Sequence, residues 1–154
     1  MRTILYVSRT KIAAPVTTEN VGFLLAKASQ RFNELLGERF AGRGFNEVRA
    51  SYGSVLVPLF ERDGLRPGDL AAASRLSKQA ITGLIRQCEA DGLVERRRDE
   101  VDGRAFNVRL TARGRMVQAA AEDILAELDE ALVDSLGTRD RDGLVRGLKG
   151  VMEL

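Results

Sequence analysis

The 154-residue chain contains no histidine, no tryptophan and a single cysteine, Cys88. Without histidine it lacks the commonest metal ligand and the usual general base, which excludes serine–histidine and cysteine–histidine catalysis within the chain. A single cysteine also excludes an intrachain disulfide. The sequence offers no other metal-ligand cluster, glycine-rich phosphate loop or nucleophile–base pair. We therefore expect a protein that is not an enzyme and uses no cofactor or metal.

Long apolar runs are missing as well. No stretch reaches about 18 consecutive apolar residues, so no transmembrane helix and no membrane partner are expected. The apolar run after Met1 is too short for a signal peptide, which makes a cytoplasmic location the default. The composition, 44% hydrophobic and 30% charged with a net charge of +2, is typical of one globular domain. Such a small net charge does not identify a partner, so the positions of the arginines matter more.

Apolar residues at helical spacing predict the outer parts of the chain. Residues 1–16 read as an N-terminal arm, and a first helix is expected over about 18–40 with Thr17 or Thr18 at its start. Asn46 is expected to cap a second helix that ends at about residue 62. Beyond the central region, Thr111 is expected to cap a long helix to about Leu136, and a last helix follows.

The central region, residues 65–110, predicts a DNA-binding fold. A short helix opens at Pro67, a second runs from Lys78 to Asp91 after a capping Ser77, and two strand-like segments at 93–98 and 104–110 flank an Asp-Gly turn. Helix, tight connection, helix and β-hairpin in this order make a winged helix-turn-helix, whose second helix enters the major groove. The fold class expected is therefore mainly α with a small β-hairpin wing.

The second of these helices carries polar residues on its outward face. Gln79 can pair with adenine, and Arg86 can reach a guanine or a phosphate. Lys78 and Thr82 suit phosphates or bases, and Ser77 lies at a helix N-terminus that attracts phosphate. We expect all five to contact DNA.

Arginines are concentrated around the predicted hairpin. Arg96, Arg97 and Arg98 precede its turn, and Arg104 follows it. The negative potential of a narrow minor groove attracts an inserted arginine. Asp102 is close enough in sequence to orient the Arg104 guanidinium as an ion-pair partner. These five residues complete the predicted DNA site.

Both elements also have plainer interpretations. The helix face is compatible with an ordinary solvated surface, and a charged hairpin edge protects against strand aggregation. Asp99 and Glu100 would repel phosphate at the tip, which supports the second interpretation in part.

These residues resemble the MarR (multiple antibiotic resistance regulator) family over about fifty positions. The resemblance rests on Gly68-Asp69-Leu70-Ala71, Leu76–Thr82, Leu84-Ile85, Glu89–Arg96, Asp102-Gly103-Arg104 and Leu110–Gly114. It implies N- and C-terminal dimerisation helices, residues 17–62 and 111–154, which would interlock two copies of the chain. It further implies a homodimeric repressor on a pseudo-palindromic operator in double-stranded DNA, released by a small aromatic or phenolic ligand.

The resemblance leaves alternatives open. Apolar surface on the outer helices supports dimerisation, but those helices also suit an intramolecular bundle. Two other functions remain open. One is a DNA-binding regulator or architectural protein without an effector. The other is a winged domain used only for protein contacts. The family's redox-sensing branch has a cysteine near the first helix. Cys88 instead lies on the inward face of the predicted helix from Lys78 to Asp91, which favours a packing role.

An effector pocket is expected between the first, second and long fifth helices. Its candidate lining residues are aromatic or aliphatic, and each also suits an ordinary core position. They are Phe32, Tyr52, Val55, Leu56 and Phe60.

Overall fold

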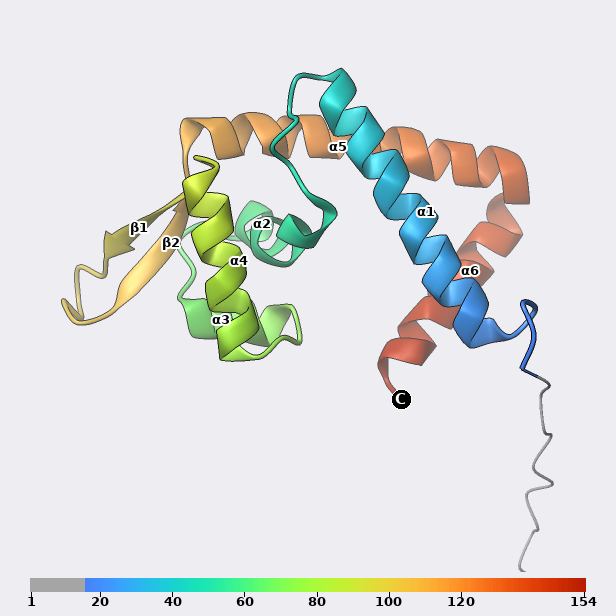
Figure 1. Ribbon diagram of the computed structural model, residues 1–154, viewed down its shortest axis with the longest axis horizontal. Helices are drawn as coiled ribbons and strands as arrows, with labels where there is room; N and C mark the ends of the chain where they lie inside the picture. Colours follow the sequence, from blue (N-terminus) through green and yellow to red (C-terminus); the bar gives the residue numbers. More distant parts are fainter. Residues whose placement is uncertain (1–15) are drawn as a thin grey trace, which may run out of the picture. The chain divides into compact units, whose positions relative to one another are not determined.

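The computed structural model describes residues 16–154 (Figure 1), so nearly all of the predicted arm lies outside the described residues. The described residues fall into two compact units, residues 16–35 and residues 36–154. The elements, in order, are α1 (Val21–Gly42), a short 3-10 helix η1 (Ala50–Tyr52), α2 (Gly53–Glu61), α3 (Pro67–Ala73), α4 (Lys78–Ala90), β1 (Val94–Arg98), β2 (Phe106–Leu110), α5 (Ala112–Leu136) and α6 (Thr138–Met152). This mainly helical chain with an antiparallel hairpin confirms the winged helix-turn-helix prediction.

The first unit contains the start of α1, which differs from the prediction. The helix begins at Val21, where Asn20 Oδ1 accepts the Gly22 backbone N–H at 2.9 Å. Thr17, one of the two predicted caps, instead accepts the Glu19 N–H in the preceding turn at 3.3 Å. The predicted cap is therefore wrong by a few residues, because Asn is as good an N-cap as Thr. The end of α1, from Leu36 onward, belongs to the second unit.

The segment after α1 corrects a second prediction. Asn46 caps no helix, and the chain stays irregular until η1 begins at Ala50. The reason is a long-range contact from the start of α5. The Arg113 guanidinium pairs with Glu47 at 2.6 Å and donates to the Gly44 carbonyl at 2.7 Å, and it lies over the Phe45 ring. These contacts hold the segment outside helical geometry and override its local preference.

Helix α2 tolerates a proline because another helix satisfies the carbonyl that the proline leaves free. Pro58 has no N–H, so the Ser54 carbonyl loses its intrahelical donor. The Ser74 hydroxyl, at the end of α3, donates to that carbonyl instead. The proline thus creates a hydrogen bond that ties α2 to α3.

The hairpin pairs β1 and β2 in antiparallel register, with Val94 opposite Leu110 and Arg98 opposite Phe106. Leu65 adds a single bridge, its carbonyl accepting the Val108 N–H at 2.8 Å. The second strand begins two residues later than predicted, because residues 104 and 105 belong to the turn.

The core of the second unit joins α2, α4, the hairpin and α5. Its largest fully buried side chains come from these elements, from α3, from η1 and from the connection between α4 and β1. They are Tyr52, Leu59, Leu70, Ile81, Ile85, Leu93, Ile124, Val55, Val94, Val108, Val117 and Cys88. The predicted inward position of Cys88 is confirmed. Burial, followed by the nearby Asp91 carboxylate, raises the pKa of the Cys88 thiol to about 12. None of the helices in the described part of the chain combines the length and apolar composition needed to cross a membrane.

Candidate nucleic-acid interface

The recognition helix α4 begins as predicted. Ser77 Oγ accepts the Ala80 N–H at 3.1 Å, which satisfies one free amide at the helix start. Lys78 and Gln79 in the first turn are exposed, and so is Arg86 two turns later. The structure thus brings the predicted polar residues of α4 together on its surface.

Thr82 and Gly83 give this face its shape. The Thr82 hydroxyl donates to the Lys78 carbonyl at 2.7 Å, so its methyl group and its oxygen lone pairs remain available to a partner. A Cβ atom at Gly83 would meet nothing within 4 Å, so this glycine leaves the helix backbone open to close approach.

The three consecutive arginines of β1 have different surroundings. Arg96 pairs with Glu89 of α4 at 3.1 Å and lies over the Phe106 ring, 5.2 Å from its centroid. Arg97 pairs with Glu95 at 2.6 Å. Arg98 has no ion-pair partner among residues 16–154.

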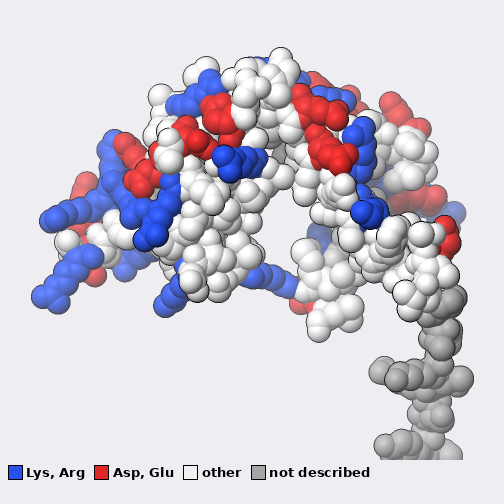
Figure 2. Space-filling view, viewed as in Figure 1, with Lys and Arg blue, Asp and Glu red and all other residues white. Residues whose placement is uncertain are grey.

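Arg104, at the turn of the hairpin, is exposed and likewise has no ion-pair partner within the described residues. In Figure 2 Lys and Arg side chains project into solvent at the hairpin end of the second unit. Among the described residues, the guanidinium groups of Arg98 and Arg104 are therefore unpaired and open to phosphate, as is that of exposed Arg109 on β2.

The acidic tip is partly neutralised by a contact that the sequence did not reveal. Asp99 accepts the Val101 N–H at 2.9 Å, the Arg66 guanidinium at 2.6 Å and the Asp102 N–H at 3.3 Å. These three partners lower the pKa of the Asp99 carboxyl to about 2, so it stays ionised. Because its charge is paired with Arg66, Asp99 repels phosphate far less than expected from the sequence alone. Arg66 lies 33 positions earlier, and no local pattern signals this pair.

Asp102 has a different partner from the one predicted. Its Oδ1 accepts the Arg104 backbone N–H at 3.2 Å, whereas the guanidinium was the expected donor. This contact closes the turn, since the Ala105 N–H also donates to the Asp102 carbonyl at 2.9 Å. Asp102 therefore shapes the turn that carries Arg104 and does not hold the side chain itself.

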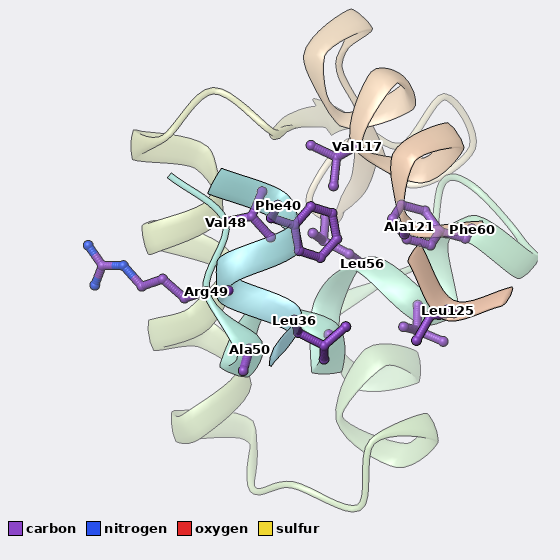
Figure 3. Close-up of a pocket in the computed structure, with 13 residues that line it drawn as sticks. Leu36, Phe40, Val48, Arg49, Ala50, Leu56, Phe60, Val117, Ala121 and Leu125 are labelled. Atoms are coloured by element: carbon purple, nitrogen blue, oxygen red, sulfur yellow. The ribbon is translucent and has the colours of Figure 1, made fainter. Parts of the chain in front are cut away.

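A cavity of about 110 Å³ lies between the end of α1, the η1–α2 segment and α5 (Figure 3). Its walls are almost wholly apolar; the lining residues are Leu36, Gly37, Phe40, Val48, Arg49, Ala50, Gly53, Leu56, Val57, Phe60, Val117, Ala121 and Leu125. Figure 3 shows the Arg49 guanidinium pointing away from the cavity. The interior thus presents hydrocarbon and no charge.

Two of the five predicted pocket residues, Leu56 and Phe60, line this cavity. Tyr52 and Val55 do not line it; both are completely buried in the core. Phe32 belongs to the other unit and is not among the lining residues. The prediction correctly placed the long helix α5 beside the pocket but named none of its lining residues, Val117, Ala121 and Leu125. Helical spacing marks a residue as apolar without showing whether it faces a core or a cavity.

Metal binding finds no support in the described residues, which contain no group of three or more histidine, cysteine or acidic side chains able to hold an ion.

Comparisons with known proteins agree with this geometry. A sequence profile of the MarR family matches residues 59–105. The HTH-type transcriptional repressor YetL of Bacillus subtilis is 30% identical over 130 residues, which cover 81% of this chain and 74% of YetL. Solved structures that share the fold include two regulators of known DNA-binding behaviour. The Staphylococcus aureus MepR–DNA complex matches with a TM-score of 0.74 and 22% identity, covering 87% of this chain and 97% of MepR. Bordetella bronchiseptica BpsR, whose DNA binding is regulated by 6-hydroxynicotinic acid, matches with a TM-score of 0.75 and 22% identity, covering 92% and 99%.

Proposed function

Because this chain belongs to the MarR family of DNA-binding transcriptional regulators, we propose that it is a homodimeric repressor that a small ligand releases from its operator. Residues 65–110 would form the DNA-binding part, and residues 17–62 and 111–154 would supply the dimerisation helices. The observation that carries the proposal is the pairing of an exposed polar face on α4 with unpaired arginines on the neighbouring hairpin.

In this proposal the two parts of the site have separate tasks. Gln79 and Arg86 read base edges in the major groove, while Ser77, Lys78 and Thr82 fix the register through phosphates. Arg104 enters the minor groove from the wing, and Arg97 and Arg98 contact the backbone. Arg96 and Asp102 act indirectly, since the Arg96–Glu89 ion pair and the hydrogen bond from the Arg104 N–H to Asp102 stabilise the conformation of the hairpin.

A salt series of fluorescence anisotropy tests DNA binding, using a duplex from the region flanking the chain's own gene and a scrambled duplex of equal length. We expect tighter binding to the first duplex, with affinity falling steeply as salt rises. Equal binding to both duplexes across several flanking segments would reduce the function to non-specific DNA binding. No salt-dependent binding to either duplex would favour a winged domain used for protein contacts.

Single substitutions then assign the roles. Arg104→Ala should weaken binding by about 1–3 kcal/mol, whereas Arg39→Ala, which removes the same charge from α1, should leave it unchanged. Gln79→Ala should relax the preference at particular bases, and Lys78→Ala should weaken all sequences alike. Equal losses on operator and scrambled DNA for Gln79→Ala would mean that this residue does not read bases.

Exposed apolar residues on the C-terminal helices support the homodimer. Helix α6 has no buried residue, and its Leu144, Leu148, Val151 and Met152 side chains are between 41% and 57% exposed. Apolar surface of this kind usually marks a partner interface. Sedimentation equilibrium should give twice the 16.9 kDa chain mass, and Leu148→Lys should shift the protein towards monomer. A monomeric wild-type chain at micromolar concentration would refute this part of the proposal.

The cavity supports a small effector with little polarity. Its 110 Å³ is well below the roughly 300–1,000 Å³ of pockets for drug-sized ligands, so a single aromatic ring is the largest group it takes without expansion. A thermal-shift screen with uncharged phenols and with phenolic acids such as salicylate, repeated on Ala121→Leu to fill the cavity, tests this. We expect a shift for the wild-type protein that the substitution abolishes. No shift by any such compound would favour the alternative, a DNA-binding regulator or architectural protein without an effector.

A further inference from the structure

The 3-10 helix η1 has two sides that contact different parts of the second unit. Ala50, together with the flanking Arg49 and Gly53, lines the cavity. Tyr52 is completely buried and is absent from the cavity lining. Its hydroxyl donates a hydrogen bond to Asp91 Oδ2, 39 residues further along the chain. One short segment thus forms a wall of the cavity and also holds Asp91.

Asp91 occupies the junction between the recognition helix and the wing. It is the C-cap residue of α4, and its backbone N–H donates to the Gln87 carbonyl at 3.0 Å. Gly92 follows with a left-handed φ of 73°, and its carbonyl accepts the Thr111 hydroxyl at 2.6 Å. The first strand of the wing starts two residues later, at Val94. A displacement of Asp91 would therefore act on the end of α4 and on the base of the hairpin together.

The Tyr52–Asp91 hydrogen bond is well suited to transmit such a displacement. Burial, and then the hydrogen bond to Asp91, raise the pKa of the Tyr52 phenol to about 12, so the phenol keeps its proton at any physiological pH. A hydrogen bond to an ionised carboxylate is about twice as strong as one between neutral groups. The ring fills a close-packed core, so it cannot move without moving its neighbours.

The wall itself is shorter and less regular than the α-helices around it. Helix η1 is three residues long, and no side-chain hydrogen bond caps its start. An isolated 3-10 turn has poorer hydrogen-bond geometry than an α-helix. The opposite wall is α5, a helix of 25 residues. We therefore expect an occupant larger than the 110 Å³ cavity to displace η1 more than α5.

We propose that η1 carries occupancy of the cavity to the DNA-binding surface, with Tyr52 as the positioning residue that moves Asp91 at the α4–wing junction. The inference rests on the proposed function in one respect, since it names the route by which an effector would change DNA affinity. The route itself is a property of the folded chain and can be tested without DNA or ligand.

A substitution inside the cavity serves as a fixed occupant. Ala121 lines the cavity from α5, so Ala121→Leu adds three carbon atoms opposite η1. We would compare the wild-type chain, Ala121→Leu, Tyr52→Phe and the double variant by hydrogen exchange of the backbone amides over residues 87–93. Ala121→Leu should change these exchange rates about fivefold or more when Tyr52 is present, a value at the lower end of common allosteric couplings. In the Tyr52→Phe background the same substitution should change them less than about twofold.

The matched control is Ala119→Leu, which adds the same atoms to an exposed position of α5 outside the cavity. It should leave exchange over residues 87–93 unchanged in both backgrounds. A purely structural role of Tyr52 would raise exchange equally with and without the cavity substitution. Only a transmitting role makes the effect of Ala121→Leu depend on the phenol hydroxyl.

A second readout follows the hydrogen bond itself. The chain has two tyrosines and no tryptophan, so Tyr6→Phe leaves Tyr52 as the only tyrosine. Its near-ultraviolet absorbance then reports the loss or lengthening of the hydrogen bond to Asp91 when Ala121→Leu is added. Should Ala121→Leu fail to fold, Ala121→Val is a milder occupant for both measurements.

The proposal is overturned if folded Ala121→Leu or Ala121→Val leaves residues 87–93 unchanged, or if the change persists undiminished after Tyr52→Phe. These outcomes are separate from a failure of the proposed function. If salicylate releases the wild-type protein and Tyr52→Phe equally well from DNA, the effector proposal stands and the route through Tyr52 is wrong. If no phenolic acid binds but exchange shows the coupling, the route stands without those effectors.

Discussion

A glycine near the start of α5 supports a strong prediction about stability. Gly114 is buried in the first turn of the helix, where its N–H donates to Thr111 Oγ1 at 3.0 Å. A Cβ atom at this position would lie 2.1 Å from the Leu93 carbonyl oxygen and 3.2 Å from Leu110 Cδ2. The closest clash is with backbone, so no side-chain rotation relieves it. We predict that Gly114→Ala forces the start of α5 away from the hairpin.

The cost follows from the contacts that this movement breaks. Restoring a normal contact needs a shift of about 1 Å, which strains the Thr111 N–H bond to the Leu93 carbonyl and the Thr111 hydroxyl bond to the Gly92 carbonyl. Two such bonds contribute about 1–3 kcal/mol, and overpacking costs a further 1–3 kcal/mol or so. The better helix propensity of alanine returns about 1 kcal/mol. We therefore expect Gly114→Ala to lower the free energy of unfolding by about 1–5 kcal/mol.

Urea denaturation at one fixed protein concentration measures this effect, since a dimer's apparent stability depends on concentration. Gly83→Ala is the matched control, because it is also a helical glycine and a Cβ there meets nothing within 4 Å. It should stabilise the protein by about 0.5–1 kcal/mol and, if α4 approaches DNA closely, weaken DNA binding. A Gly114→Ala variant within about 0.5 kcal/mol of the wild type would refute the reasoning.

Three further predictions concern the wing, the buried phenol and the thiol. Arg66→Gln leaves the Asp99 charge at the wing tip without its guanidinium partner, so DNA affinity should fall in an anisotropy titration, and the added change Asp99→Asn should restore part of it. An unchanged affinity would mean that the tip lies away from phosphate. The pKa of the Tyr52 phenol is raised from 10.0 to about 12, so its contribution to the free energy of unfolding is fully present below pH 10 and is lost as pH rises from 10 to about 12. In the Tyr6→Phe background, phenolate absorbance that appears at pH 10 in the folded protein would contradict this. Buried Cys88, whose pKa is about 12, should react with thiol reagents only as fast as the protein opens, and rapid labelling of the native chain would contradict its burial.

The features that the sequence predicted are those with local causes. Ser77 and Thr111 cap their helices as expected, because a hydroxyl three residues before a free amide is a short-range interaction. The inward face of α4, with Ile81, Ile85 and Cys88 buried, follows from helical spacing. The order of helices and strands in the winged region was correct for the same reason. Local signals therefore sufficed for the fold class.

The features that were missed depend on contacts between distant residues. Arg113 holds the chain around Glu47 out of the helix that Asn46 was expected to cap, and 66 residues separate the two ends of that pair. Tyr52 was predicted to line the pocket, but it is buried in the core, where its hydroxyl donates a hydrogen bond to Asp91. No periodicity or turn signal carries such information, since it describes only neighbours along the chain.

The arginines show why the candidate site needed the structure. The chain has 24 basic and 22 acidic residues, so a run of arginines favours DNA binding but is also compatible with a charged, solvated hairpin. The structure separates them by partner: Arg66 and Arg96 are bound to Asp99 and Glu89, whereas Arg98 and Arg104 have no ion-pair partner in residues 16–154. A paired arginine must give up its carboxylate before it binds phosphate, while an unpaired one loses only water and counterions. The salt dependence of DNA binding should therefore fall when Arg98 or Arg104 is replaced and change little when Arg96 is replaced, even though Arg96 and Arg98 occupy the same strand.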